Sequence, residues 1–201
     1  MKSPLMYQLS EYNAGETAIF NCLSFLFDRN EMPLEFIKIM SSYSVGCYDD
    51  SGMLENGAFC DNLLFFAASW LEDYAKEKNI PLVAKYITAD DVNLLEIRKC
   101  LLAGGCVDLK TEKNGKHYIT ITKMDDRYIY AFDPYYKPVG EFKPAAGVEV
   151  VNDKPFLYNR KILIERFISE KSLEYTLGIE KYREAILFYR RDSIKEREFV
   201  V

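Results

Sequence analysis

Three residues of this chain have the types and spacing of a thiol acyl-transfer site. A fourth position, where the nucleophile would stand, holds an alanine. Such chemistry needs a thiolate, an imidazole that exchanges protons with it, a group that orients the imidazole, and an amide donor for the oxyanion. Gln8 stands six residues before Ala14, and Gly15 follows. His117 is the only histidine, and Asp133 comes sixteen residues after it. Ala14 stands where a cysteine is expected.

The predicted local structure brings His117 and Asp133 together. The stretches HYITITK (117–123) and RYIYAFD (127–133) alternate and are rich in β-branched and aromatic residues, which predicts a hairpin closed by Met-Asp-Asp. His117 begins the first of these strands and Asp133 ends the second, so both lie at one end of the hairpin. Position 14 is predicted to open a helix, where the partial positive charge of a helix start lowers the pKa of a thiol.

The remaining elements divide the chain into a helical first half and a strand-rich second half. Helices are expected over 14–27, from Pro33 over PLEFIKIMSSYS, from about 60 to 78, and from Asp90 or Asp91 (as N-cap) to 103, with a loop over 44–58. Further strands are expected over 82–87 and 106–110, an irregular excursion over 134–160, a helix over 159–169, and a strand or short helix over 183–191. Helices followed by a mostly antiparallel sheet predict an α+β fold in one domain spanning 1–201.

Composition narrows the function classes. The chain has 201 residues, is 49% hydrophobic and carries a net charge of −5, which argues against nucleic-acid binding. The first residues lack a secretory h-region, and the most apolar run, 63–71, is too short to span a bilayer, so we expect a cytoplasmic protein without membrane contact. Five cysteines without a CxxC pair and a single histidine argue against a metal site, and no cofactor is expected.

The quoted residues resemble the papain-like cysteine peptidases of the C39 type. Gln8, the YNAGETA stretch (12–18), HYITIT (117–122) and FDP (132–134) follow that family's order of Gln, Cys-Gly at a helix start, His-Tyr before a strand, and Asp-Pro. The resemblance covers roughly 5–135 as a core and leaves 136–201 as an extension that completes the sheet and pocket. It implies a papain-like fold, with Gln8 in the oxyanion hole, His117 as general base and Asp133 as its orienting residue.

The residues beside these positions are expected to form the substrate pocket. They are Asn13, Gly15, Cys47, Tyr118 and Tyr135. Cys47, in the predicted loop, is also an alternative nucleophile. Cys22 follows Ala14 by about two helical turns on the apolar stripe, and we interpret it as a core residue.

Ala14 has two interpretations. The chain is either a natural pseudoenzyme that retains the pocket as a binding module, or a Cys-to-Ala variant of an active enzyme. The second is favoured, because a drifting pseudoenzyme has no reason to keep the base, its orienting residue and the oxyanion donor together.

Three functions follow from the resemblance. The favoured one is amide formation from a carrier-protein thioester to an amine in secondary-metabolite biosynthesis, as in free-standing relatives such as the amide synthetase of closthioamide biosynthesis. The alternatives are a peptidase that cleaves a leader or other peptide, and the binding module. The partners would be an acyl or peptidyl carrier protein, or a peptide, with an amine acceptor. The basic residues considered for carrier docking are Lys110, Lys113, Lys116, Arg160, Lys161 and Arg166.

Overall fold

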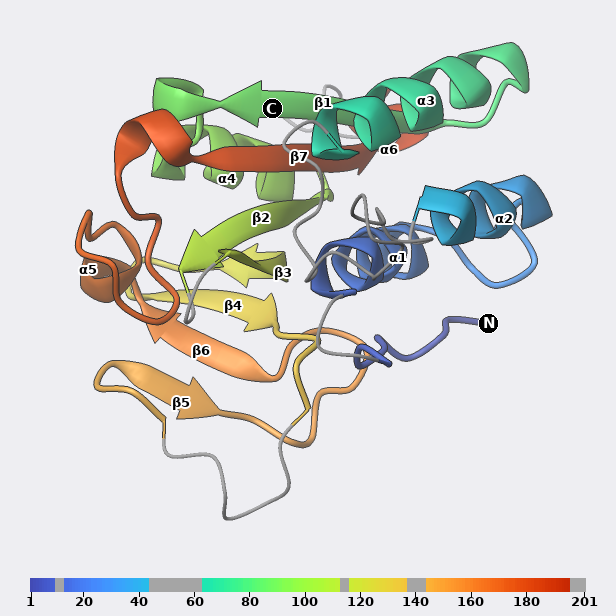
Figure 1. Ribbon diagram of the computed structural model, residues 1–201. Helices are drawn as coiled ribbons and strands as arrows, with labels where there is room; N and C mark the ends of the chain where they lie inside the picture. The colour runs from blue at the N-terminus through green and yellow to red at the C-terminus, as the bar shows by residue number, and fades with distance from the viewer. Residues whose placement is uncertain (10–12, 44–62, 113–115, 137–143, 196–201) are drawn as a thin grey trace, which may run out of the picture.

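The sheet of this protein collects strands from both halves of the sequence. The computed structural model describes residues 1–9, 13–43, 63–112, 116–136 and 144–195 (Figure 1). In these residues seven antiparallel strands have the order β1-β7-β2-β3-β4-β6-β5. The strands are β1 (Leu82–Thr88), β2 (Cys106–Glu112), β3 (Lys116–Met124), β4 (Tyr128–Phe132), β5 (Val148–Val150), β6 (Arg160–Leu163) and β7 (Glu184–Arg190).

Helices cover both faces of this sheet. They are α1 (Ala14–Leu26), α2 (Leu34–Tyr43), α3 (Leu63–Glu77), α4 (Leu94–Leu102), α5 (Ile164–Phe167) and α6 (Arg191–Lys195), with short 3₁₀ turns at Ala89–Asp91 and Glu180–Tyr182. Helices α1 and α3 pack on one face around one core cluster, and α4 and α5 pack on the other face around a second (Figure 1). The mixed α+β class expected from the sequence is therefore confirmed.

Two contacts fix the direction of α1 on the sheet. The Thr120 hydroxyl donates a hydrogen bond of 3.0 Å to the carbonyl of Ala18, and one turn later the Cys106 thiol lies 3.5 Å from the carbonyl of Cys22. Asp108 pairs with Thr120 in antiparallel register, so Cys106 lies further along the direction of β3. Helix α1 therefore runs with β3, and both begin at the same end of the sheet.

Strand β7 lies inside the sheet, between β1 and β2, although it comes last in the chain. Its residues Ala185, Ile186, Leu187 and Phe188 are all buried. A continuous apolar run of this kind is typical of a strand that is covered on both faces. Strand β7 thus completes the interior of the sheet, and the open choice over 183–191 is resolved in favour of a strand.

The start of α4 differs from the prediction. Asp90 and Asp91 lie in a 3₁₀ turn, and the helix begins only after Asn93, whose side chain accepts a hydrogen bond of 3.0 Å from the backbone N–H of Glu96. The predicted aspartate N-cap is therefore wrong. The helix ends close to the predicted residue 103, and Gly104 follows it with a φ of 80°, a backbone conformation that favours glycine.

The helix predicted over 159–169 is also wrong in its first half. Arg160 and Ile162 are buried and alternate with half-buried neighbours, as a strand requires, and they form β6 beside β4. Only Ile164–Phe167 is helical. The excursion expected over 134–160 contains another strand, β5.

The close approach of α4 to β7 allows a stability prediction at Gly105. A Cβ atom there would lie 2.7 Å from the Cys100 sulfur, 2.8 Å from the Cys100 carbonyl oxygen, and against the carbonyl of Phe188. Two of these atoms belong to the backbone, so Gly105→Ala should lower the free energy of unfolding by about 2 kcal/mol or more, measured by urea denaturation. Ala103→Ser, which adds one atom nearby at a half-buried position, is the control. Equal stability of the two variants would contradict the prediction.

Candidate active site

His117 and Asp133 form a buried hydrogen-bonded pair at the end of the sheet where β3 begins. Nε2 of His117 lies 2.8 Å from Oδ1 of Asp133, and the side chains are 8% and 0% exposed. The hydrogen bond expected from the hairpin is thus confirmed. The backbone N–H of Tyr135 donates to the same Oδ1 at 2.8 Å, and its ring meets the imidazole edge-on with centroids 6.4 Å apart. This arrangement leaves Nδ1 as the ring atom that can exchange a proton with a reacting group.

The other oxygen of Asp133 is held from the C-terminal part of the chain. The hydroxyl of Tyr175 donates to Oδ2, and Nη2 of Arg160 lies 3.9 Å from the same oxygen. Arg160 also donates from Nε to the Tyr175 hydroxyl at 3.1 Å. Burial, followed by the charge of Asp133, raises the pKa of Tyr175 well above its usual range, so the phenol stays a neutral donor. Together these contacts fix the carboxylate and, through it, the imidazole.

Asn159 fixes the backbone of Asp133. Its Oδ1 accepts a hydrogen bond of 2.7 Å from the Asp133 N–H, and its Nδ2 donates to the Asp133 carbonyl at 2.8 Å. The position of the carboxylate is therefore determined at its main chain as well as at its oxygens.

Gln8 and Ala14 lie at this same end of the sheet. The backbone N–H of Gln8 donates at 2.8 Å to the carbonyl of Pro134, the residue after Asp133. Ala14 is the first residue of α1 and 8% exposed, and α1 and β3 begin together. The structure thus gathers position 14, Gln8, His117 and Asp133 at one end of the sheet, while direct contact between position 14 and the imidazole stays a prediction.

The other residues expected in the pocket have different surroundings. Asn13 precedes α1, and its carbonyl accepts hydrogen bonds from both the N–H and the hydroxyl of Thr17. Gly15 is buried in α1, and Tyr118 is buried in the core cluster that includes Ala14. Cys47 lies outside the described residues.

The interpretation of Cys22 as a core residue agrees with its surroundings. It is fully buried, and this burial, together with its contact with Cys106, raises the pKa of the Cys22 thiol well above its usual range. Such a thiol is a poor nucleophile.

Two of the basic residues considered for carrier docking are not available at the surface. Arg160 is 5% exposed and serves the Asp133 network. The Lys110 side chain is 13% exposed and forms an ion pair with Glu184. Their role in docking a carrier is therefore withdrawn, since both charges already have buried or half-buried partners.

Sequence reasoning missed Asn159, Arg160 and Tyr175. No local pattern marks them, because they meet Asp133 only through the placement of β6 beside β4 and the return of the chain after α5. The nearest available signal was the pair Asn159-Arg160, which stands at the start of the alternating stretch that forms β6. The prediction assigned this stretch to a helix over 159–169.

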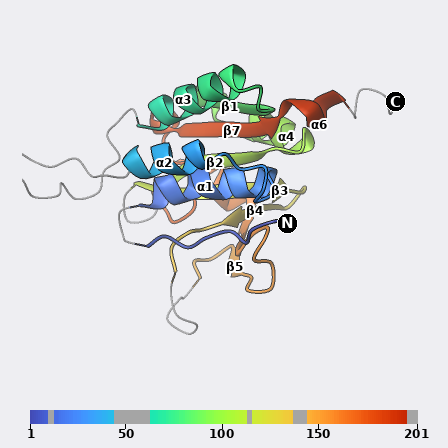
Figure 2. The same ribbon diagram turned by 90° about the vertical axis from the view of Figure 1, so that its right-hand side faces the viewer.

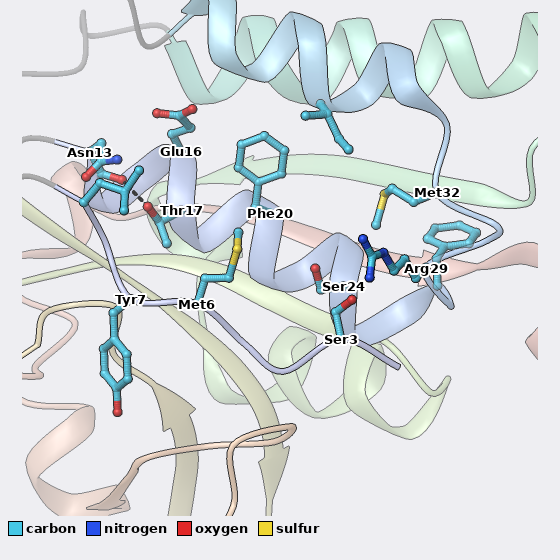
Figure 3. A pocket seen from close by; sticks show the side chains of 13 residues that line it. Ser3, Met6, Tyr7, Asn13, Glu16, Thr17, Phe20, Ser24, Arg29 and Met32 are labelled. Atoms are coloured by element: carbon cyan, nitrogen blue, oxygen red, sulfur yellow. Dashed lines mark hydrogen bonds between the residues drawn. The ribbon is translucent and has the colours of Figure 1, made fainter. Parts of the chain in front are cut away.

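A mostly apolar groove of about 510 Å³ begins beside the start of α1 (Figure 3). We call it the α1 groove. Its lining residues are Ser3, Met6, Tyr7, Leu9, Asn13, Glu16, Thr17, Phe20, Ser24, Phe27, Arg29, Met32 and Ile37. Its size lies within the range of small-molecule sites.

The Tyr175 hydroxyl should matter for stability as well as for positioning. Tyr175→Phe removes the donor to Oδ2 of Asp133 and leaves a buried carboxylate oxygen with one partner fewer. We expect the free energy of unfolding to fall by about 1–3 kcal/mol in urea denaturation. Tyr182→Phe, at a residue that is 58% exposed, is the control and should be nearly neutral. A Tyr175→Phe variant as stable as the control would show that this hydrogen bond carries little weight.

Within the described ranges, no helix has the length and apolarity to cross a membrane, and no three side chains among His, Cys, Asp and Glu are grouped to hold a metal ion. The sequence matches no protein-family model, and a search of curated proteins gives no match.

Proposed function

We propose that this chain carries the site of a thiol acyl-transfer enzyme with a papain-like fold of the C39 type, with position 14 as the seat of the nucleophile. The observation that carries the proposal is the buried His117–Asp133 hydrogen bond at the end of the sheet where α1 begins. The backbone N–H of Gln8 is hydrogen-bonded to the residue after Asp133, and this nearness supports the role of its side-chain amide as the oxyanion donor. With Ala14 the chain binds donors without turning them over.

The chemistry with a cysteine at position 14 follows from these roles. The thiolate attacks the carbonyl carbon of a thioester, and the Gln8 side chain donates to the developing oxyanion. The protonated His117 gives its proton to the departing thiol, which leaves an acyl-enzyme. An amine then attacks the carbonyl carbon of this enzyme-bound thioester, and His117 takes a proton from the amine. The bond between the carbonyl carbon and the sulfur breaks, which releases the amide and restores the thiolate. Asp133 stabilises the imidazolium in both halves of the reaction.

We favour amide formation from a carrier-bound thioester. One feature supports this choice: a mostly apolar groove begins at Asn13, the residue before position 14. The carrier itself remains part of the proposal.

The test uses the Ala14→Cys variant with acyl thioesters, with and without a panel of amines, and identifies products by mass spectrometry. Amides that form only with the variant support the proposal. Hydrolysis of peptides in place of amide formation would make the chain a peptidase, and absence of any acyl adduct would leave it a binding module.

A further inference from the structure

One side of helix α1 faces the sheet, and the opposite side lines the α1 groove. Ala18 and Cys22 lie against the sheet. Asn13, Thr17 and Ser24 lie on the other side and line the α1 groove, together with Glu16, Phe20 and Phe27 at the spacing of one helical face (Figure 3). At 1.5 Å per residue, the groove follows the helix for about 20 Å from Asn13 to Phe27. The groove is therefore long, and Asn13, the residue before position 14, lines one end of it.

The N-terminal segment forms one wall of the groove. Met6 is held along α1 by two hydrogen bonds with Asn21: the Met6 N–H donates to Oδ1 at 2.6 Å, and Nδ2 donates to the Met6 carbonyl at 3.0 Å. The terminal amine of Met1 is bound to Asp28 at 2.7 Å. Since the segment is tied at both places, this wall is part of the fold and presents side chains to the groove.

The groove suits an apolar chain better than a peptide. Seven of its lining residues are apolar or aromatic: Met6, Tyr7, Leu9, Phe20, Phe27, Met32 and Ile37. The backbone N–H and carbonyl of Met6 and the hydroxyl of Thr17 already have partners. A peptide would bring an amide every few ångströms into this space and leave many of them without a hydrogen bond, which is costly.

We infer that the α1 groove binds the linear hydrocarbon chain of an acyl thioester, with the thioester at the Asn13 end beside position 14 and the chain directed toward Phe27 and Met32. This inference rests on the proposed function and deepens it, because it names the class of acyl group. Each methylene that enters the groove should tighten binding about four-fold, until the groove is filled.

The test uses the chain with Ala14, which binds without reacting. Butanoyl, octanoyl, dodecanoyl and tetradecanoyl thioesters of N-acetylcysteamine are titrated by calorimetry. We expect affinity to rise by about four-fold per methylene across the series. Affinity that does not depend on chain length would overturn the inference.

Ser24 offers a way to shorten the groove. It is half-buried and lies about 16 Å along the helix from Asn13. Ser24→Phe should weaken the tetradecanoyl thioester by at least about ten-fold while the butanoyl thioester changes less than about two-fold, since about two methylenes or more lose their place. Ser24→Ala, which does not obstruct the groove, is the matched control. Equal weakening of all four thioesters by a folded Ser24→Phe variant would refute the assignment.

A photoreactive thioester with a diazirine at the end of its chain tests the orientation without any substitution. It should label the stretch from Phe20 to Met32 in the unchanged protein, and labelling confined to other elements would overturn the inference.

The tests of the groove and of the proposed function have separate outcomes. If affinity depends on chain length but Ala14→Cys forms no acyl-enzyme, the groove assignment stands and the proposed catalysis is refuted. If Ala14→Cys forms an acyl-enzyme but affinity does not depend on chain length, the proposed catalysis stands and the groove assignment is refuted.

Discussion

Ala14→Cys should give the chain an activity that it lacks with Ala14: formation of an acyl-enzyme from acyl thioesters, followed by turnover. The substitution adds a single sulfur atom at the first residue of α1, where the helix start favours the thiolate. The hydrogen bond between His117 and Asp133 is already formed at the same end of the sheet. Loss of a covalent nucleophile typically costs on the order of 10⁴- to 10⁶-fold in turnover, so we expect a gain of that size.

Intact-mass spectrometry should show one added acyl group on the Ala14→Cys protein. His117→Ala in that background should abolish turnover, and Gln8→Ala should lower it by about 10²- to 10³-fold if its amide donates to the oxyanion. Ala103→Cys, which places a thiol at the end of α4, is the matched control for unspecific acylation. Equal turnover by Ala14→Cys and the unchanged chain, or equal acylation of the control, would sink the proposal.

The sequence was sufficient to predict the His117–Asp133 pair because the pair is local. Two alternating strands joined by a short turn fix which residues lie at the open end of the hairpin, and Asp125 reinforces that turn by accepting the N–H groups of Arg127 and Tyr128 at 2.8 and 2.7 Å. The same reasoning placed position 14 at the start of α1, since its apolar stripe begins there. Local pattern and tertiary structure agree at these positions.

The support of the site was not predictable in the same way. Tyr175 reaches Asp133 across 42 residues of sequence, and Arg160 reaches it through the pairing of β6 with β4. Neither contact has a periodic signal, because each depends on the order of strands in the sheet. The burial of Asp108 depends on the same order of strands, because helices cover both faces of β2 in the complete sheet.

Asp108 should lower the stability of the protein as the pH rises. Its side chain is 0% exposed on β2, and within the described part of the chain neither carboxylate oxygen has a hydrogen-bond partner. Burial raises the pKa of Asp108 well above the ordinary aspartate value of 3.8, so the folded protein keeps this proton after the unfolded chain has lost it. Unfolding then releases a proton, and stability is greatest below the unfolded pKa. Above it, stability falls by about 1.4 kcal/mol per pH unit until the folded pKa is passed.

Asp108→Asn, which has no proton to lose, should remove this dependence. In urea denaturation between about pH 5 and pH 8, the variant should show a flatter stability profile and exceed the unchanged chain by about 2 kcal/mol or more at the upper end. Asp126→Asn is the matched control, because the Asp126 side chain is 100% exposed and its substitution should leave the slope in place. A slope that survives in Asp108→Asn, or a variant that is less stable at every pH, would mean that this carboxyl group is ionised in the fold and has a partner that stabilises its charge.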